Sequence, residues 1–258
     1  MKLSFLALTA MLFTMFACKD DEIHPVGEEP RLLSYESVSG NFKLTAEYAY
    51  DSQDRIKKIS WERSTPGTTR GVDEFTYDDT GKMAEQIRSI SGIAQEKTTY
   101  TWDDGDVFAS TIYNNNNKKI GFSFYDYNQA GQLEKVEIYH GEGDVGFLRT
   151  DSIGFTYHAD GNLFKMFKYA GDNSGVMTLT STQTFPEYFS SPNPVATVEI
   201  LPIVKLQREL PKGYVVADIE NNSFSYSMQY DLRKDGYPKK RTVTSVGAVE
   251  QTVYTYDR

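Results

Sequence analysis

The sequence predicts an all-β protein: an up-and-down antiparallel meander of roughly 14–16 strands, strongly curved or barrel-like, built from hairpin repeats of about 25 residues. Three observations lead to this prediction. First, a short motif recurs, in which two aromatic residues separated by one position precede an Asp, Asn or His and then a Gly and an aliphatic residue. Second, its copies are spaced by the length of two strands and two turns. Third, residues 223–230 alternate between polar and apolar side chains, which is typical of a strand with one buried face.

Each copy of the motif marks a hairpin turn. The polar residue after the second aromatic can bond the backbone ahead of it, and the Gly supplies a positive φ. The two aromatic residues lie on one face of a strand. After the turn, the odd spacing from Leu133 to Val136 indicates a β-bulge at the start of the next strand. The second aromatics of the copies are Tyr50, Tyr77, Trp102, Tyr127, Tyr157, Tyr230 and Tyr256.

This unit resembles the Tyr-Asp (YD/Rhs) repeat, in which consecutive hairpins build an antiparallel sheet that curls into a shell. Residues 31–258 together look like a Bacteroidetes lipoprotein family of unknown function with a porin-like β fold. Two copies depart from the pattern, since Asp54 stands where Gly is usual and the turn after Trp102 is one residue shorter. The resemblance implies a fold and supplies no catalytic residues.

Residues 1–17 are predicted to be a lipoprotein signal peptide. Lys2 precedes an apolar run that ends at Ala17 and is shorter than the ~20 residues of a spanning helix. The segment Met15–Cys18 resembles a bacterial lipobox, which implies that the thiol of Cys18 carries the lipid that anchors the chain to a membrane. The alternative is a plain secretory signal, which would leave Cys18, the only cysteine, as an unpaired thiol in an oxidising compartment.

Residues 18–30 are predicted to be the acylated cysteine and a flexible tether, and residues 31–258 a single β-repeat domain. Lys19, Asp20 and Asp21 look like the export signal of Bacteroidetes lipoproteins, which implies an outer-membrane lipoprotein exposed at the cell surface. The alternative is a solvated linker on a lipoprotein that faces the periplasm. Charges within the predicted strands, such as those at Lys57 and Lys58, argue against strands that face lipid.

The repeat is interrupted by an irregular, proline-rich insertion at about residues 186–213. Proline cannot donate to a strand ladder, so a regular central strand is not expected there. We expect the insertion to pack over the sheet or to plug a barrel mouth. Irregular inserts on a rigid sheet often form binding sites, and the alternative is a plain cap over an apolar face or edge.

Composition argues against several classes of function. Asp and Glu number 36 against 27 Lys and Arg, a net charge of -9, which argues against nucleic acid as a partner. We expect no metal or cofactor: no residue spacing matches a zinc site, and Asp103–Asp106 coincides with a repeat turn and lacks a full calcium loop. His158 occupies the polar turn position of its repeat and is therefore interpreted as a turn residue. We predict no enzymatic activity; a carboxylate-dependent glycoside hydrolase is the weakest alternative, because the sequence nominates no carboxylate pair.

Aromatic residues make up 14% of the chain, and they give the remaining indication of function. Exposed Tyr and Trp side chains stack on sugar rings and anchor protein partners. Trp61 and Trp102 are the candidate ligand-binding residues, with packing in the core as the alternative. The sequence thus predicts a lipid-anchored, non-enzymatic cell-envelope protein that binds a glycan or protein partner, or alternatively an envelope structural or assembly scaffold. Asp151-Ser152-Ile153 also resembles the site at which exported Bacteroidetes proteins are O-glycosylated.

Overall fold

The computed structural model describes residues 29–141, 146–195, 204, 206–220 and 222–258. The predictions for Cys18, Lys19, Asp20 and Asp21 therefore lie outside the described residues. Arg31–Arg258 form one compact unit, and the fold below is that of this unit. Within the described residues, no helix is long and apolar enough to cross a membrane.

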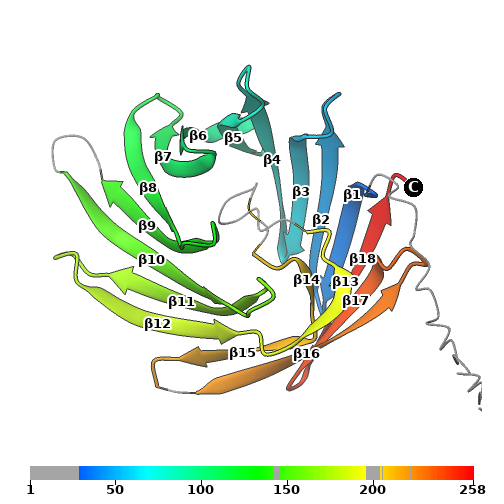
Figure 1. Cartoon of the computed structure of the whole chain (residues 1–258). Helices are drawn as coiled ribbons and strands as arrows, with labels where there is room; N and C mark the ends of the chain where they lie inside the picture. The colour runs from blue at the N-terminus through cyan, green and yellow to red at the C-terminus, as the bar shows by residue number, and fades with distance from the viewer. Residues whose placement is uncertain (1–28, 142–145, 196–203, 205, 221) are drawn as a thin grey trace, which may run out of the picture. The chain divides into compact units, whose positions relative to one another are not determined.

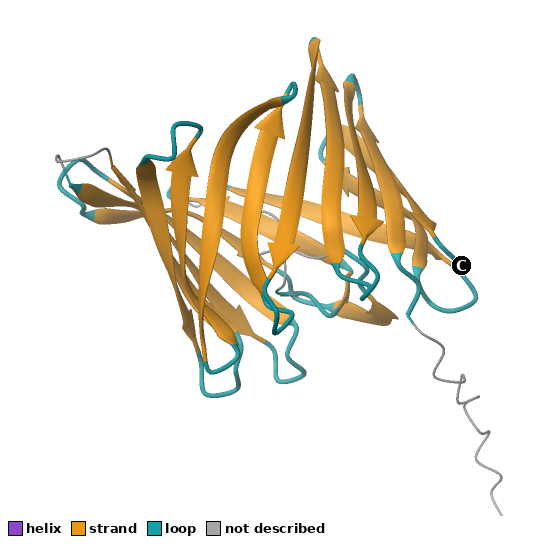
Figure 2. Cartoon of the chain, turned by 90° about the horizontal axis from the view of Figure 1, so that it is seen from above, coloured by secondary structure: helices purple, strands orange, loops and turns teal. Residues whose placement is uncertain are grey.

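The described part of the chain is all-β and contains eighteen strands, sixteen of which close an antiparallel barrel (Figures 1 and 2). The predicted fold class is confirmed, and the sheet closes fully. A separate two-stranded sheet consists of β13 (Tyr188–Pro192) and β14 (Glu209–Pro211). The barrel strands are β1 (Leu32–Ser39), β2 (Phe42–Tyr50), β3 (Ile56–Thr65), β4 (Gly67–Tyr77), β5 (Met83–Ile90), β6 (Ile93–Asp103), β7 (Asp106–Asn114), β8 (Lys119–Tyr127), β9 (Leu133–Gly141), β10 (Phe147–Tyr157), β11 (Leu163–Gly171), β12 (Met177–Thr184), β15 (Gly213–Asp218), β16 (Ser223–Leu232), β17 (Pro238–Ser245) and β18 (Ala248–Tyr256).

The repeat turns have the geometry that the motif predicts. In the turn between β8 and β9, Asn128 Oδ1 accepts bonds from the backbone N–H of Ala130 (2.9 Å) and of Gln132 (3.0 Å), while Gly131 has a φ of 71°. The strand register shifts between Asp126 and Tyr127, which places a bulge beside the turn. Asp54, at the usual Gly position of the first copy, adopts a φ of 61° itself. A short polar side chain is one of the few that tolerate this conformation.

The second aromatic of most copies fastens its hairpin to the one before. Tyr77 donates its hydroxyl to the carbonyl of Ile56 (2.7 Å), and Tyr157 donates to that of Leu133 (2.5 Å). The same kind of contact starts from Tyr50, Trp102, Tyr230 and Tyr256. The aliphatic residue after the turn is buried in four of the copies, at Met83, Val107, Leu133 and Leu163. Turns that follow alternate strands of a meander lie at one end of the barrel, so the core is concentrated at the repeat-turn end.

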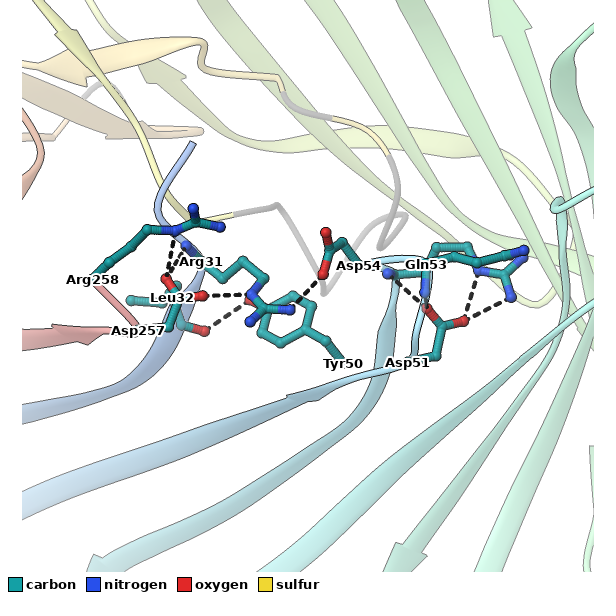
Figure 3. Close-up of polar contacts among 9 residues, drawn as sticks. Arg31, Leu32, Tyr50, Asp51, Gln53, Asp54, Asp257 and Arg258 are labelled. Carbon is teal, nitrogen blue, oxygen red and sulfur yellow. Dashed lines mark hydrogen bonds and ion pairs between the residues drawn. The ribbon is translucent and has the colours of Figure 1, made fainter. Parts of the chain in front are cut away.

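Closure depends on contacts between the two ends of this unit. β1 pairs with β18 along most of its length. Arg31 donates its backbone N–H to Asp257 Oδ1 (3.0 Å) and its Nε to Oδ2 (2.6 Å), and it also forms an ion pair with Asp54 in the turn after β2 (Figure 3). These bonds tie the last strand to the first hairpin.

The proline-rich insertion enters the barrel, and Figure 1 shows β14 within the ring of strands. Leu206 and Leu210 are each 2% exposed, and Leu206 packs in the core cluster formed by β7–β11. Asn162, also 2% exposed, holds the segment. Its Oδ1 accepts the N–H of Arg208 (3.1 Å) and of Glu209 (3.0 Å), and its Nδ2 donates to the Glu209 carboxylate (2.9 Å). The described part of the insertion thus packs inside the barrel and against its core.

Candidate functional site

A cavity of about 820 Å³ lies inside the barrel. Its walls come from β1–β5, from β16–β18 and from the insertion, which contributes Asn193, Val195, Gln207, Leu210 and Pro211. Alternate residues of each strand face inward, so Ile59, Trp61 and Arg63 of β3 all reach the cavity. The volume falls within the range of roughly 300–1,000 Å³ that is common for small-ligand sites.

One wall of the cavity is aromatic. The ring centroids of Tyr35 and Tyr48 lie 6.3 Å apart, and those of Tyr35 and Tyr254 lie 6.5 Å apart. Tyr230 and Trp61 also line the space. Burial raises the pKa of Tyr48, Tyr230 and Tyr254 above the ordinary tyrosine value, which is itself well above neutral pH, so their hydroxyls are protonated and uncharged in neutral solution.

Trp61 is positioned by a glycine on the neighbouring strand. It pairs with Gly71 of β4, and a Cβ at position 71 would lie only 2.1 Å from Cζ2 of the indole. The indole therefore lies across Gly71, where a larger residue would displace it. Its Nε1 donates to Asp73 Oδ2 (3.1 Å), which fixes the orientation of the ring.

Asp73 is the polar centre of this wall and is only 3% exposed. Besides the indole, it accepts bonds at Oδ1 from Gln86 Nε2 (2.9 Å) and Arg88 Nε (2.8 Å), and Gln86 in turn accepts the Tyr100 hydroxyl (2.8 Å). Burial acts to lower the pKa of Arg88, but its hydrogen bond and charge pairing with Asp73 outweigh this and raise it. A carboxylate with three donors is satisfied, so Asp73 is interpreted as an anchor for Trp61 and Arg88.

Two further arginines line the cavity. Arg241 donates from Nη2 to Glu250 (2.6 Å) and Thr252 (3.1 Å), whereas its buried Nε has no partner among the described residues. Arg63 is exposed, and its side chain makes no hydrogen bond or ion pair with the part of the chain that the structure describes. The lining thus carries three guanidinium groups, from Arg63, Arg88 and Arg241, and one carboxylate, from Asp73.

Comparisons with known proteins bear on the fold. No family model matches the chain, and no curated protein matches it. Among solved structures, the chain is similar to a porin-like protein from Bacteroides uniformis, with 14% identity, coverage of 88% of this chain and 98% of that one, and a TM-score of 0.59. It is also similar to a porin-like protein from Bacteroides vulgatus, with 12% identity, coverage of 89% and 99%, and a TM-score of 0.51. The fold is porin-like. At such low identity the likeness concerns the fold alone.

The porin-like barrel separates the two predicted ligand-binding tryptophans. Trp61 lines the cavity, whereas Trp102 packs against both core clusters, donates Nε1 to the carbonyl of Met83 (2.8 Å) and is not part of the lining. Trp102 thus occupies the position that tyrosine takes in other repeats and forms the same contact to the preceding hairpin. Both tryptophans are partly buried and pack against the core, and of the two only Trp61 also lines the cavity.

Other residues singled out in the sequence lie away from the cavity lining. The backbone carbonyl of His158 accepts the Gly161 N–H within the turn (3.0 Å), and Nε2 of its ring forms a hydrogen bond with the carbonyl of Phe185 (2.8 Å). Ser152, the central residue of the segment that resembles an O-glycosylation site, lies on β10 and is only 5% exposed. Among the described residues, no cluster of His, Cys, Asp and Glu could hold a metal ion, and this includes Asp103–Asp106.

The sequence reading missed the arginines of the cavity. Arg63 stands two positions after Trp61, on the same face of the strand, so alternation alone could have placed it inward. Arg88 lies on β5, two strands along the meander from Trp61, and reaches it through Asp73 of β4. Arg241 lies on β17, and its approach to Trp61 depends on the pairing of β1 with β18 that closes the barrel.

Proposed function

We propose that this chain is a non-enzymatic binding protein of the bacterial cell envelope, anchored by a lipid on Cys18, which binds part of a glycan in the cavity of its porin-like barrel. The observation behind this proposal is the cavity itself. It combines an aromatic wall, several polar side chains and a volume suited to a small ligand.

The chemistry of the lining suits a sugar. Sugar rings present an apolar face that packs on aromatic rings, and Trp61 and Tyr48 offer such surfaces. Sugar hydroxyls need hydrogen-bond partners, and Asn193 and Gln207 of the insertion supply amide donors and acceptors at the same cavity. The insertion thus contributes to binding as well as covering the core.

The outer face of the barrel supports anchoring by lipid rather than burial of the wall in a bilayer. Ion pairs join outward-facing residues of neighbouring strands, such as Arg70 with Glu62 (2.6 Å) and Lys43 with Glu36 (2.8 Å). Charged groups on a lipid-facing strand cost roughly 2–4 kcal/mol each near the bilayer centre. These pairs suit a wall that faces water.

Native mass spectrometry tests ligand binding. The mature wild-type domain is mixed with pools of plant, host and bacterial oligosaccharides, alongside Trp61→Ala and a control, Phe108→Ala. Phe108 is 50% exposed on β7 and absent from the cavity lining. We expect at least one pool to bind, with at least a tenfold loss for Trp61→Ala and no change for Phe108→Ala. Failure of every pool to bind, or equal binding by Trp61→Ala, would contradict the proposal.

Protease accessibility on intact cells tests the location. We expect wild type to be cleaved and a Lys19/Asp20/Asp21→Ala variant to be protected, which would identify these residues as a surface-export signal. If wild type is protected until the outer membrane is breached, the protein faces the periplasm instead.

One observation favours the second candidate, an envelope scaffold. Aromatic rings at outward-facing positions of β7–β10 form a connected cluster. The ring of Phe122 stacks on that of Tyr139, with 4.7 Å between the centroids, and it contacts the rings of Phe124 and Phe147 edge-on, with centroid distances of 5.4 Å each. Exposed apolar patches often mark protein interfaces. A photocrosslinker placed at Phe108 is expected to capture one defined envelope protein in cells if the scaffold role holds, whereas one placed at Val246, an exposed hairpin residue, is not.

A further inference from the structure

The cavity lining is rich in positive charge, although the chain as a whole is negatively charged. The whole protein has a net charge of -9, yet three of the four ionised groups in the lining are guanidinium groups. Asp73 pairs with Arg88, and Glu250 pairs with Arg241. Arg63 is left without an opposing charge among the described residues. The cavity therefore carries a net positive charge next to its aromatic wall.

The register places two of these arginines on either side of the indole. Trp61 is level with Gly71 of β4, Arg63 is level with Thr69 nearer the β3–β4 hairpin, and Arg88 is level with Asp73 nearer the core. Arg63 is thus toward the exposed end and Arg88 is deeper. The hydrogen bond that fixes Arg88 to Asp73 uses Nε, so this contact leaves its Nη groups for other acceptors.

From this arrangement we infer that the ligand of the cavity is an acidic carbohydrate, whose sugar ring packs on Trp61 and whose carboxylate or sulfate group pairs with Arg63. The inference rests on the proposed function, that the cavity binds a glycan. Guanidinium groups bind such anions through paired hydrogen bonds and keep their charge at any physiological pH. The lumen tyrosines stay neutral, so they add no competing negative charge.

The lining argues against a fatty acid as the anionic ligand. Polar groups occur on several walls, including Thr69, Asn193 and Gln207 besides the arginines. An alkyl chain would cover these groups without giving them hydrogen-bond partners, which is costly for buried polar atoms. Sugar hydroxyls would satisfy them.

Calorimetric titration tests the inference with matched probes: digalacturonate and its methyl ester, and a sulfated heparin disaccharide and its desulfated form. Each of these sugars, and palmitate, is titrated into wild type, Arg63→Gln, Arg70→Gln and Trp61→Ala. Arg70 is the control because it is an exposed arginine on the outer face of the adjacent strand. We expect at least one acidic probe to bind at least tenfold more tightly than its neutral form. Arg63→Gln should remove that preference and Arg70→Gln should keep it.

The outcomes separate this inference from the proposed function. If acidic and neutral forms bind equally and Trp61→Ala abolishes both, the cavity binds glycans but the inference of an acidic ligand is wrong. If a preference for acid persists in Arg63→Gln, the assignment of Arg63 is wrong. If palmitate binds and no sugar does, or if nothing binds, the inference and the proposed function both fail.

Discussion

Replacing Gly71 with alanine is expected to destabilise the barrel by displacing Trp61. The new Cβ would lie 2.1, 2.3 and 2.7 Å from three carbons of the indole, whereas non-bonded carbons pack at ~3.5–4.0 Å. The ring must therefore move by more than about 1 Å, which strains its bond to Asp73. Gly71 has an ordinary φ, so the backbone itself tolerates alanine.

The expected magnitude follows from three contributions. Overpacking costs ~1–3 kcal/mol. Loss of the indole bond to a carboxylate costs ~1.5–3 kcal/mol. Alanine also restricts the unfolded chain more than glycine does, which stabilises the folded state by ~0.4–1 kcal/mol. The sum is a loss of roughly 2–5 kcal/mol in the free energy of unfolding.

Urea denaturation followed by circular dichroism measures this loss, and a double-mutant cycle identifies its cause. In a Trp61→Ala background, Gly71→Ala should no longer destabilise the barrel and should show only the gain of ~0.4–1 kcal/mol from the restricted unfolded chain, because the clash is gone. Gly154→Ala on β10 is the control, since its Cβ would meet nothing nearer than 3.8 Å. An equal cost of Gly71→Ala in both backgrounds would refute the reasoning.

Three further results are expected. Asn162→Ala removes three hydrogen bonds to the insertion, so the free energy of unfolding should fall by ~2–4 kcal/mol and residues 186–213 should be digested faster; unchanged protease resistance would contradict this. Gly131→Ala should cost ~1–2 kcal/mol through its φ of 71° alone, because nothing lies within 4 Å, and Gly131→Asn should cost less. Burial raises the pKa of Tyr50 to about 12, so the contribution of Tyr50 to stability should be constant below about pH 10, the tyrosine value in an unfolded chain, and should fall above it as the unfolded chain loses the proton first; denaturation midpoints that stay constant from pH 9 to pH 11 would argue against this.

The turns and strands were predictable because their chemistry is local. Asn128 bonds the backbone two and four residues ahead, so a short motif is enough to encode the turn. Closure is not local. The bond between Arg31 and Asp257 joins residues at opposite ends of this unit, and no short pattern reveals it. The sequence therefore predicted a curved sheet and left open whether it closes.

The site was predicted only in part. Trp61 and Trp102 are equal in size and belong to the same inward-facing set, so alternation could not distinguish a cavity from a filled core. What separates them is the neighbourhood: Gly71 and Asp73 position Trp61 at the cavity, whereas Met83 receives the indole bond of Trp102 in the core. These partners come from other strands and become visible only in the folded barrel.

The central claim is that the lumen beside Trp61 binds an acidic glycan. The most direct measurement uses the Trp102→Phe variant, in which Trp61 is the only tryptophan and gives a single indole N–H signal in a nitrogen-15 NMR spectrum. Because this N–H bonds to Asp73 in the cavity wall, we expect digalacturonate or the heparin disaccharide to shift it saturably. An indole signal that does not move with either probe at millimolar concentration would contradict the claim.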